Sequence, residues 1–190
     1  MNIMSLSRRH FIKTGGIALG SLPFLSLANP VSENTTLKVG LIGCGGRGTG
    51  AVVQALMADP NVVVTALADI YQDKVNQTLD ILNKRDSTRI SIPTERQFVG
   101  FDSYKQLIDS DVDVVLLCSP PNFRPDHLEY AVLANKHVFC EKPVAVDIPG
   151  LKRVMESVRL SKARNLKLVS GFCFRYSTPN REIMERIKKG

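Results

Sequence analysis

The chain has 190 residues and a formal net charge of +7, and 44% of its residues are hydrophobic. Without its basic leader it has about 160 residues, which is enough for one domain with a substantial core and excludes a second domain of full size. Its four cysteines show neither a C-x-x-C pair nor zinc-ligand spacing, so we expect no metal site, no disulfide framework, and small buried side chains at Cys44, Cys118, Cys140 and Cys173.

Residues 1–28 are predicted to be an export signal. Basic residues precede an apolar stretch and a small residue, Ala28, in the order of a secretory signal. The segment SRRHFIK at residues 7–13 resembles the twin-arginine signal, Ser-Arg-Arg-x-Phe-Leu-Lys, whose export machinery carries folded proteins. An ordinary secretory signal is the alternative. The apolar stretch is shorter than the ~20 residues of a membrane helix, so we expect a periplasmic or otherwise exported protein without a stable membrane span.

Strand-like apolar runs alternate with helical patterns from residue 37 onward. The runs indicate strands within 37–43, 61–69, 112–120, 137–143 and 166–174. The patterns between them indicate helices within 44–60, 71–83, 102–110, 125–136 and 149–165. Residues 84–97 break the periodicity and are expected to form a surface excursion. This alternation predicts βαβ units, and hence an α/β fold with a Rossmann-type doubly wound parallel sheet.

The C-terminal residues 151–190 are strongly basic. They hold 11 basic and 3 acidic side chains, whereas residues 29–150 hold 11 and 15. The aromatic residues of this tail, Phe172, Phe174 and Tyr176, cluster in one apolar segment. Solvated helix faces and a docking surface are therefore favoured over a nucleic-acid site.

A glycine-rich turn lies between the first predicted strand and the first predicted helix. Gly43, Gly45 and Gly48 form the pattern G-x-G-x-x-G. The first glycine permits a tight turn, the second lets the backbone approach a pyrophosphate, and the third lets helix and strand pack closely. The anion then lies at a helix N-terminus, where the dipole favours negative charge. The predicted pyrophosphate-binding residues are Gly43, Gly45, Gly46, Arg47 and Gly48.

Asp69 is the predicted ribose ligand, because it ends the second strand 21 residues after Gly48. An acid there can accept hydrogen bonds from both ribose hydroxyls and would repel a 2′-phosphate, which favours NAD over NADP. Two alternatives stay open. Asp69 could cap the next helix, and Arg47 could pair with a phosphate, cover the pyrophosphate or face solvent. A methyltransferase would share the glycine-rich turn and the acid, so the rest of the chain must separate the classes.

The triplet Glu141-Lys142-Pro143 distinguishes an oxidoreductase from a methyltransferase. It lies directly after the strand-like HVFC. Together with the glycine-rich turn, Asp69, the segment CSPPNFRPDH and the segment GFCFRY, it resembles the Gfo/Idh/MocA family of NAD(P)-dependent oxidoreductases. The resemblance runs from about residue 37 to the end of the chain. Glu-Lys-Pro is its most specific element.

The resemblance implies roles for individual residues. Lys142 matches the catalytic lysine that lies beside the nicotinamide and polarises the substrate oxygen, at the carboxyl end of a strand, where open parallel sheets bind ligands. Pro143 shapes the backbone there, and His127 is expected to be structural. The implied cofactor contacts of the nicotinamide half are Ser119, Pro120, Asn122, Glu141, Lys142 and Arg175. No residue is implied as a metal ligand.

The resemblance also implies the reaction. It is the exchange of a hydride between a secondary alcohol and NAD, on a sugar, sugar derivative or cyclitol, in a protein that forms homo-oligomers. One alternative is a glycosidase with tightly held NAD, although such relatives tend to lack Glu-Lys-Pro. The other is a non-enzymatic NAD-binding module.

The implied domain organisation has four parts. We expect a signal peptide at residues 1–28, a linker at 29–36, an NAD-binding Rossmann domain at 37–172, and the start of a C-terminal substrate domain at 173–190. In the family that second α/β domain supplies most substrate contacts, so these residues are expected to be an N-terminal fragment with little activity of its own.

Overall fold

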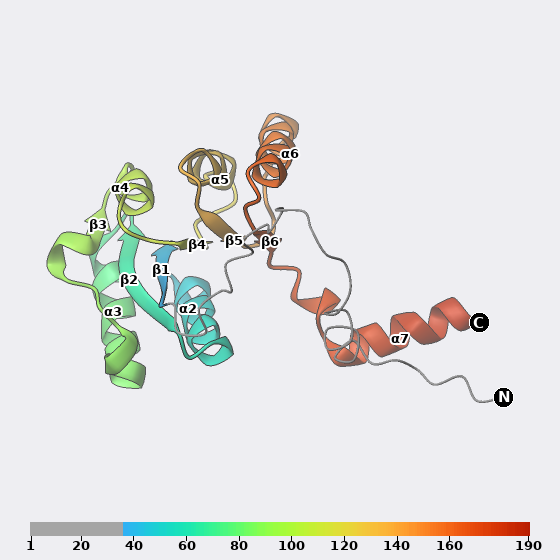
Figure 1. Ribbon diagram of the computed structural model, residues 1–190, viewed down its shortest axis with the longest axis horizontal. Helices are drawn as coiled ribbons and strands as arrows, with labels where there is room; N and C mark the ends of the chain where they lie inside the picture. Colours follow the sequence, from blue (N-terminus) through green and yellow to red (C-terminus); the bar gives the residue numbers. More distant parts are fainter. Residues whose placement is uncertain (1–35) are drawn as a thin grey trace, which may run out of the picture. The chain divides into compact units, whose positions relative to one another are not determined.

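The computed structural model describes residues 36–190, and a six-stranded parallel sheet lies at their centre (Figure 1). Its strand order is β3-β2-β1-β4-β5-β6, and every pair of neighbours is parallel. The order runs outward from β1 in both directions, which is the doubly wound arrangement with its reversal between β1 and β4. The predicted Rossmann-type sheet is confirmed.

The strands are short and rich in aliphatic residues, as expected for a parallel sheet covered on both faces. They are β1 (Leu37–Ile42), β2 (Val62–Asp69), β3 (Gln97–Val99), β4 (Val114–Leu117), β5 (His137–Cys140) and β6 (Leu168–Ser170). The longest, β2, lies beside β1, and its residues Val64–Ala68 are at most 7% exposed. The middle of β2 is therefore part of the core of the domain.

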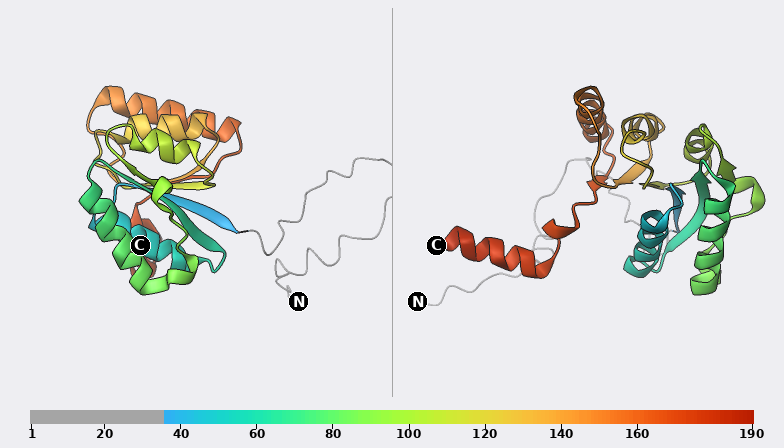
Figure 2. Two further views of the ribbon diagram at one scale, coloured as in Figure 1. Left: turned by 90° about the vertical axis from the view of Figure 1, so that its left-hand side faces the viewer. Right: turned by 180° about the vertical axis from the view of Figure 1, so that it is seen from behind.

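Helices cover both faces of this sheet (Figures 1 and 2). The helices are α2 (Gly46–Ala58), α3 (Gln72–Asp86), α4 (Ser103–Asp109), α5 (Arg124–Leu133), α6 (Ile148–Ala163) and α7 (Thr178–Lys189). Val52 of α2 and Val75 of α3 belong to the core on one face, and Leu107 of α4 and Leu128 of α5 belong to the core on the other. Helix α7 has no buried residue.

The segment 84–97 is more ordered than the sequence indicated. It contains two short 3₁₀ helices, η1 (Ser87–Arg89) and η2 (Thr94–Arg96). Ile90 forms an isolated bridge with Val64, and Ile92 is 9% exposed. The prediction of a surface excursion was therefore wrong in part, and it missed β3, which is only three residues long. A strand this short carries too little periodicity to be recognised.

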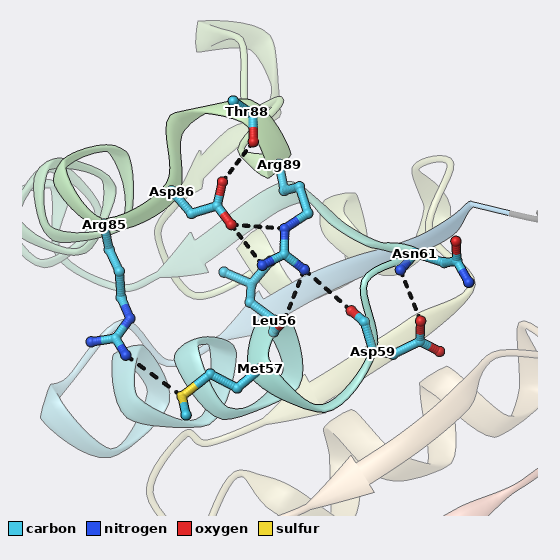
Figure 3. Close-up of polar contacts among 8 residues, drawn as sticks. All are labelled: Leu56, Met57, Asp59, Asn61, Arg85, Asp86, Thr88 and Arg89. Carbon is cyan, nitrogen blue, oxygen red and sulfur yellow. Dashed lines mark hydrogen bonds and ion pairs between the residues drawn. The ribbon is translucent and has the colours of Figure 1, made fainter.

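Arg89 attaches this segment to the end of helix α2 (Figure 3). Its Nη1 donates to the carbonyl oxygens of Leu56 at 2.7 Å and Asp59 at 3.2 Å, where helical carbonyls have no intrahelical partner. Its Nε donates to the Asp86 carboxylate at 2.7 Å. Hydrogen bonds from Thr88 and then Arg89 hold the pKa of Asp86 below its usual value. The segment 84–97 thus connects the end of α3 to the end of α2 through the hydrogen bonds of Arg89.

The last predicted strand is shorter than expected, and one cysteine prediction fails with it. Strand β6 ends at Ser170, and Cys173 lies in the 3₁₀ helix η3 (Cys173–Arg175), where it is exposed. Cys44 and Cys140 are buried as predicted, Cys118 is half-buried, and all four are free thiols. Strand β6 lies at the edge of the sheet, and the residues that follow it, 172–176, are exposed.

The described part of the chain shows neither a membrane-spanning helix nor a metal-binding cluster. None of its helices is long and apolar enough to cross a membrane. Residues 36–190 hold no group of three His, Cys, Asp or Glu side chains that could bind a metal ion. The predicted signal peptide, including SRRHFIK, lies outside the described residues.

Candidate functional site

A pocket of about 360 Å³ lies at the carboxyl ends of β1, β2 and β4, where the strand order reverses. This is the place at which doubly wound sheets bind their ligands. The predicted site residues in its wall are Gly43, Gly45, Asp69, Ser119 and Pro120. The residues in its wall that were not predicted as ligands include Tyr71, Lys74, Phe101, Phe123, Arg124 and His127.

The glycine-rich turn is shaped by contacts that allow no side chain. Gly43 has φ +96°, and a Cβ on it would lie 2.5 Å from the Ser119 backbone nitrogen. A Cβ on Gly48 would lie 1.9 Å from the Gly43 carbonyl oxygen. By contrast, a Cβ on Gly45 or Gly46 would meet no atom within 4 Å. The first and third glycines of the motif therefore close the turn, whereas the middle of the turn faces open space.

The open middle of the turn suits an anion. The backbone N–H groups of Gly46 and Arg47 begin α2, and among the described residues no acceptor takes a hydrogen bond from them. Thr78 donates to the Cys44 carbonyl oxygen at 2.9 Å, and its hydroxyl lies 2.8 Å from that of Thr49. These buried hydroxyls hold the turn against α2 and α3, so its free amides have a fixed direction. The turn fits a pyrophosphate.

Asp69 joins the turn to the end of β2. Its Oδ2 accepts from the Cys44 N–H at 2.7 Å, and its Oδ1 accepts from the Tyr71 N–H at 3.0 Å. The carboxylate thus contacts the residue that precedes α3, but the N-cap of α3 is Tyr71 and the helix has no side-chain cap hydrogen bond, so the structure does not support the capping alternative. Each carboxylate oxygen has a second acceptor site, so Asp69 can also accept from the two hydroxyls of a ribose.

Two exposed aromatic side chains stand beside Asp69. Tyr71 is 64% exposed and Phe101 is 70% exposed, and both contribute to the pocket wall together with Lys74. Tyr71 lies two residues after Asp69, so its place after the second strand could have indicated from the sequence that it lines the pocket. Phe101 was missed because it follows β3, the strand that the sequence did not reveal. Flat apolar side chains in this position fit the face of an adenine ring.

His127 forms part of the pocket wall as a neutral group. Its Nδ1 lies 3.1 Å from the Ser119 hydroxyl, and its ring stacks on Tyr104 at a centroid distance of 4.1 Å. Burial lowers the pKa of His127 to about 4. The contact fixes the orientation of the Ser119 loop, in line with the structural role expected for this histidine.

Arg47 and Glu141 form an ion pair with each other. The shortest distance is 2.5 Å, from Arg47 Nη2 to Glu141 Oε1, and Glu141 is 3% exposed. Glu141 also accepts from the Lys142 N–H at 3.1 Å, and a Cβ on Gly171 would lie 2.8 Å from its carboxylate. The sequence left open whether Arg47 meets a phosphate. Its buried carboxylate partner now accounts for its charge and links the glycine-rich turn to the end of β5.

Seven predicted site residues are not in the pocket wall: Gly46, Arg47 and Gly48 of the glycine-rich turn, Glu141 beside Arg47, and Asn122, Lys142 and Arg175. Lys142 is exposed directly after β5, beside a shallow depression that also includes Phe172. Asn122 is exposed, and the Arg175 guanidinium lies over the Phe172 ring at 5.2 Å. The described residues therefore build the half of the site around Asp69 and the glycine-rich turn, while Lys142 stands at the neighbouring carboxyl edge of the sheet.

Comparison with known proteins places these features in context. The model of the Gfo/Idh/MocA oxidoreductase family, with an NAD-binding Rossmann fold, matches residues 37–169. Myo-inositol 2-dehydrogenase of Thermotoga maritima is 25% identical over 154 residues, which cover 81% of this chain and 41% of that protein. A glycosyl hydrolase family 109 protein of Streptomyces coelicolor is 31% identical over 124 residues, which cover 64% of this chain and 25% of that protein.

A solved structure shares the fold. Scyllo-inositol dehydrogenase from Lactobacillus casei, crystallised with NAD(H) and scyllo-inositol, matches with a TM-score of 0.63 at 21% identity, over 82% of this chain and 42% of that chain. The chain thus spans about two fifths of the length of these dehydrogenases.

Proposed function

This chain belongs to the Gfo/Idh/MocA oxidoreductase family, and on that premise we propose that it binds NAD and serves hydride exchange with a secondary alcohol of a sugar, sugar derivative or cyclitol. The observation that carries the proposal is the shared pocket of Asp69 and the glycine-rich turn at the switch point of the sheet. The inositol dehydrogenases among its relatives support the substrate class.

The residues of the pocket have distinct tasks in this proposal. The free amides at the start of α2 bind the pyrophosphate, Asp69 accepts from the ribose hydroxyls, and Ser119 and Pro120 lie along the nicotinamide half. NAD supplies the nicotinamide that accepts or returns the hydride. Within residues 36–190 the Lys142 ammonium takes part in no ion pair or side-chain hydrogen bond, so it is free to donate to the oxygen of a bound substrate.

The charges in the pocket favour NAD, although a second coenzyme has some support. Asp69 would repel a 2′-phosphate, and Arg47 already has Glu141 as its partner. Lys74, in the same pocket wall, is a cation that can attract that phosphate, although its ammonium lies 3.9 Å from the Asp73 carboxylate. NADP is therefore the weaker ligand in our proposal.

Two substitutions separate binding from chemistry. We expect Asp69→Ala to weaken NAD binding about 10- to 100-fold, because it removes charge-assisted hydrogen bonds to the ribose. In the full-length enzyme with its substrate domain, Lys142→Met is expected to leave the dissociation constant for NAD within about threefold and to abolish turnover, since the lysine acts on the substrate oxygen. Calorimetric titration with NAD and NADP measures the first effect, and NADH absorbance with a panel of cyclitols and sugars measures the second. A wild-type protein that takes up no NAD would refute the proposal.

A second candidate function is an NAD-dependent glycosidase, because the glycosyl hydrolase family 109 protein is a relative at 31% identity. The two functions differ in their use of the coenzyme. A glycosidase would cleave a nitrophenyl glycoside with no net change in NADH, whereas a dehydrogenase accumulates NADH in proportion to product. The presence of Glu141-Lys142-Pro143 makes the dehydrogenase our first choice.

We also propose that residues 1–28 export the protein by the twin-arginine route. The support is the sequence SRRHFIK, followed by an apolar stretch and Ala28. Such a route reconciles export with a coenzyme pocket, because the domain can fold around NAD before it leaves the cytoplasm. The protein would then work in the periplasm with a tightly held coenzyme.

A further inference from the structure

Arg124, the first residue of α5, is a buried cation with an unusual set of partners. It is 6% exposed, and among the described residues no carboxylate lies within ion-pair distance of it. Its Nε donates to the Ser119 carbonyl oxygen at 2.8 Å. Its Nη1 donates to the carbonyl oxygens of Glu141 at 2.9 Å and Pro143 at 2.5 Å. All three acceptors are backbone groups of loops that bear predicted site residues.

These hydrogen bonds begin where strand pairing ends. The last paired residues of β4 and β5 are Leu117 and Cys140, followed by one hydrogen bond from the Glu141 N–H to the Leu117 carbonyl oxygen at 3.0 Å. Beyond that point, the Ser119 loop and the turn around Lys142 have no ladder between them. The guanidinium of Arg124 spans this gap and is the group that joins the two loops.

The chemistry of the side chain suits this task. A buried guanidinium is costly unless its N–H groups are hydrogen-bonded, and the three carbonyl oxygens meet that need. Its planar fork presents donors in fixed directions, so it can hold two loops at a set distance. A lysine has a single flexible ammonium and cannot hold both loops in the same geometry.

We propose that Arg124 is a positioning residue that sets Lys142 relative to the nicotinamide half of the pocket. It acts through the carbonyl oxygens on either side of Lys142, those of Glu141 and Pro143, and it ties them to the Ser119 loop. The inference rests on the proposed function, because it assigns the turn a task that exists only when NAD and substrate bind. Arg47 holds the Glu141 side chain, and within residues 36–190 it makes no hydrogen bond to the Ser119 loop.

The test measures how well NAD shields Lys142 from an amine reagent. The protein is acetylated with an N-hydroxysuccinimide ester with and without saturating NAD, and the rate at Lys142 is followed by mass spectrometry. In the wild type we expect NAD to slow this rate by about fivefold or more, a difference of about 1 kcal/mol in local access. In Arg124→Met we expect shielding of less than about twofold, while calorimetry gives an NAD dissociation constant within about threefold of wild type.

Three controls separate positioning from general destabilisation. The urea unfolding midpoint of each variant reports global stability, because an exposed amine such as that of Lys84 in α3 reacts at full rate even in the folded protein. Arg164→Met is a matched variant, since Arg164 also donates to backbone carbonyl oxygens, those of Val132 and Leu133 at the other end of α5. It should leave the shielding of Lys142 unchanged. Arg124→Lys keeps the positive charge and should give intermediate shielding.

The outcomes distinguish this inference from the proposed function. If NAD binds and shields Lys142 equally in the wild type, Arg124→Met and Arg124→Lys, the positioning role is wrong and the proposed function stands. If the wild type binds no NAD, both fall together. If Arg124→Met opens globally, as a large fall in its urea unfolding midpoint would show, Arg124→Lys decides, and wild-type shielding in that variant refutes the inference. In turnover assays of the full-length enzyme the supporting result is a lower kcat with little change in KM for NAD.

Discussion

At the scale of single residues, arginine side chains bind backbone carbonyl oxygens near the ends of helices and strands. Arg89, Arg124 and Arg164 each donate to carbonyl oxygens that end a helix or leave a strand. Sequence patterns gave no sign of these contacts, because their partners are main-chain atoms, most of them in segments 17 to 33 residues away. Periodicity and motifs report side-chain types, and a carbonyl oxygen is the same at every residue.

The pairing of Arg47 with Glu141 illustrates the same limit for side chains. The two residues are 94 positions apart, and each was predicted as a cofactor contact. The structure shows that they neutralise each other, since a carboxylate that is 3% exposed needs a close cation. The charge of each was visible in the sequence, but the partner was not.

His127 provides a prediction at this scale, because its pKa is about 4 when it is buried. In the unfolded chain a histidine takes up a proton below pH ~6.5, whereas the folded protein resists that proton until about pH 4. The folded state therefore loses stability as pH falls from 6.5 to 4, by up to about 3 kcal/mol from this residue. His127→Gln should lose about 2 kcal/mol less than wild type between pH 7 and 4.5. Urea unfolding at both pH values measures this, and parallel losses would contradict it.

At the scale of elements, the contact between β1 and α2 decides the geometry of the pyrophosphate site. Helix α2 begins directly after the turn, and Gly48 in its first turn lies against the Gly43 carbonyl oxygen. Because the Gly43 carbonyl oxygen and Gly48 are both backbone groups, a side chain at Gly48 can be accommodated only if α2 or the turn shifts. The motif predicted this close approach from the sequence, and the structure gives it a distance.

Gly48→Ala tests that contact. Its Cβ would lie 1.9 Å from the Gly43 carbonyl oxygen, so helix α2 must shift away from β1. We expect a loss of about 1–3 kcal/mol in the free energy of unfolding, together with a loss of NAD binding. Gly50→Ala in the same helix is the matched control, because its Cβ would come no closer than 3.7 Å to Arg47 Nη1. The control should gain up to about 1 kcal/mol. Equal stability of the two variants would refute the packing argument.

The elements also show where sequence patterns suffice and where they do not. The paired strands β1 and β2 and their helices follow the predicted ranges within a few residues, because each has a full apolar run or a full helical pattern. Strands β3 and β6 have three residues each, and the first was missed and the second overestimated. Three residues on a sheet edge are stabilised by pairing with a neighbour, and pairing leaves no local pattern.

At the scale of the whole molecule, the proposed leader and the coenzyme pocket make one joint prediction. If the protein is exported folded, protein purified from the periplasm of a bacterial host should contain bound NAD and should retain it on dilution. Periplasmic protein without NAD, or with NAD that leaves freely, would contradict the account. Replacing Arg8 and Arg9 by lysine serves as the control, since it should retain the protein in the cytoplasm without changing its NAD content.

The sequence by itself determined the fold class, the glycine-rich turn, Asp69 as the acid after the second strand, and Glu141-Lys142-Pro143 as the mark of the family. The motifs depend on residue types at fixed spacing within one βα or βαβ unit, and the fold class depends on the alternation of strand and helix patterns along the chain. The tertiary structure alone decided that Arg47 pairs with Glu141, that Tyr71 and Phe101 stand beside Asp69, and that Arg124 joins the loops around Ser119 and Lys142. These contacts arise where separate strands end at one edge of the sheet, and the order of strands in space is what brings them together.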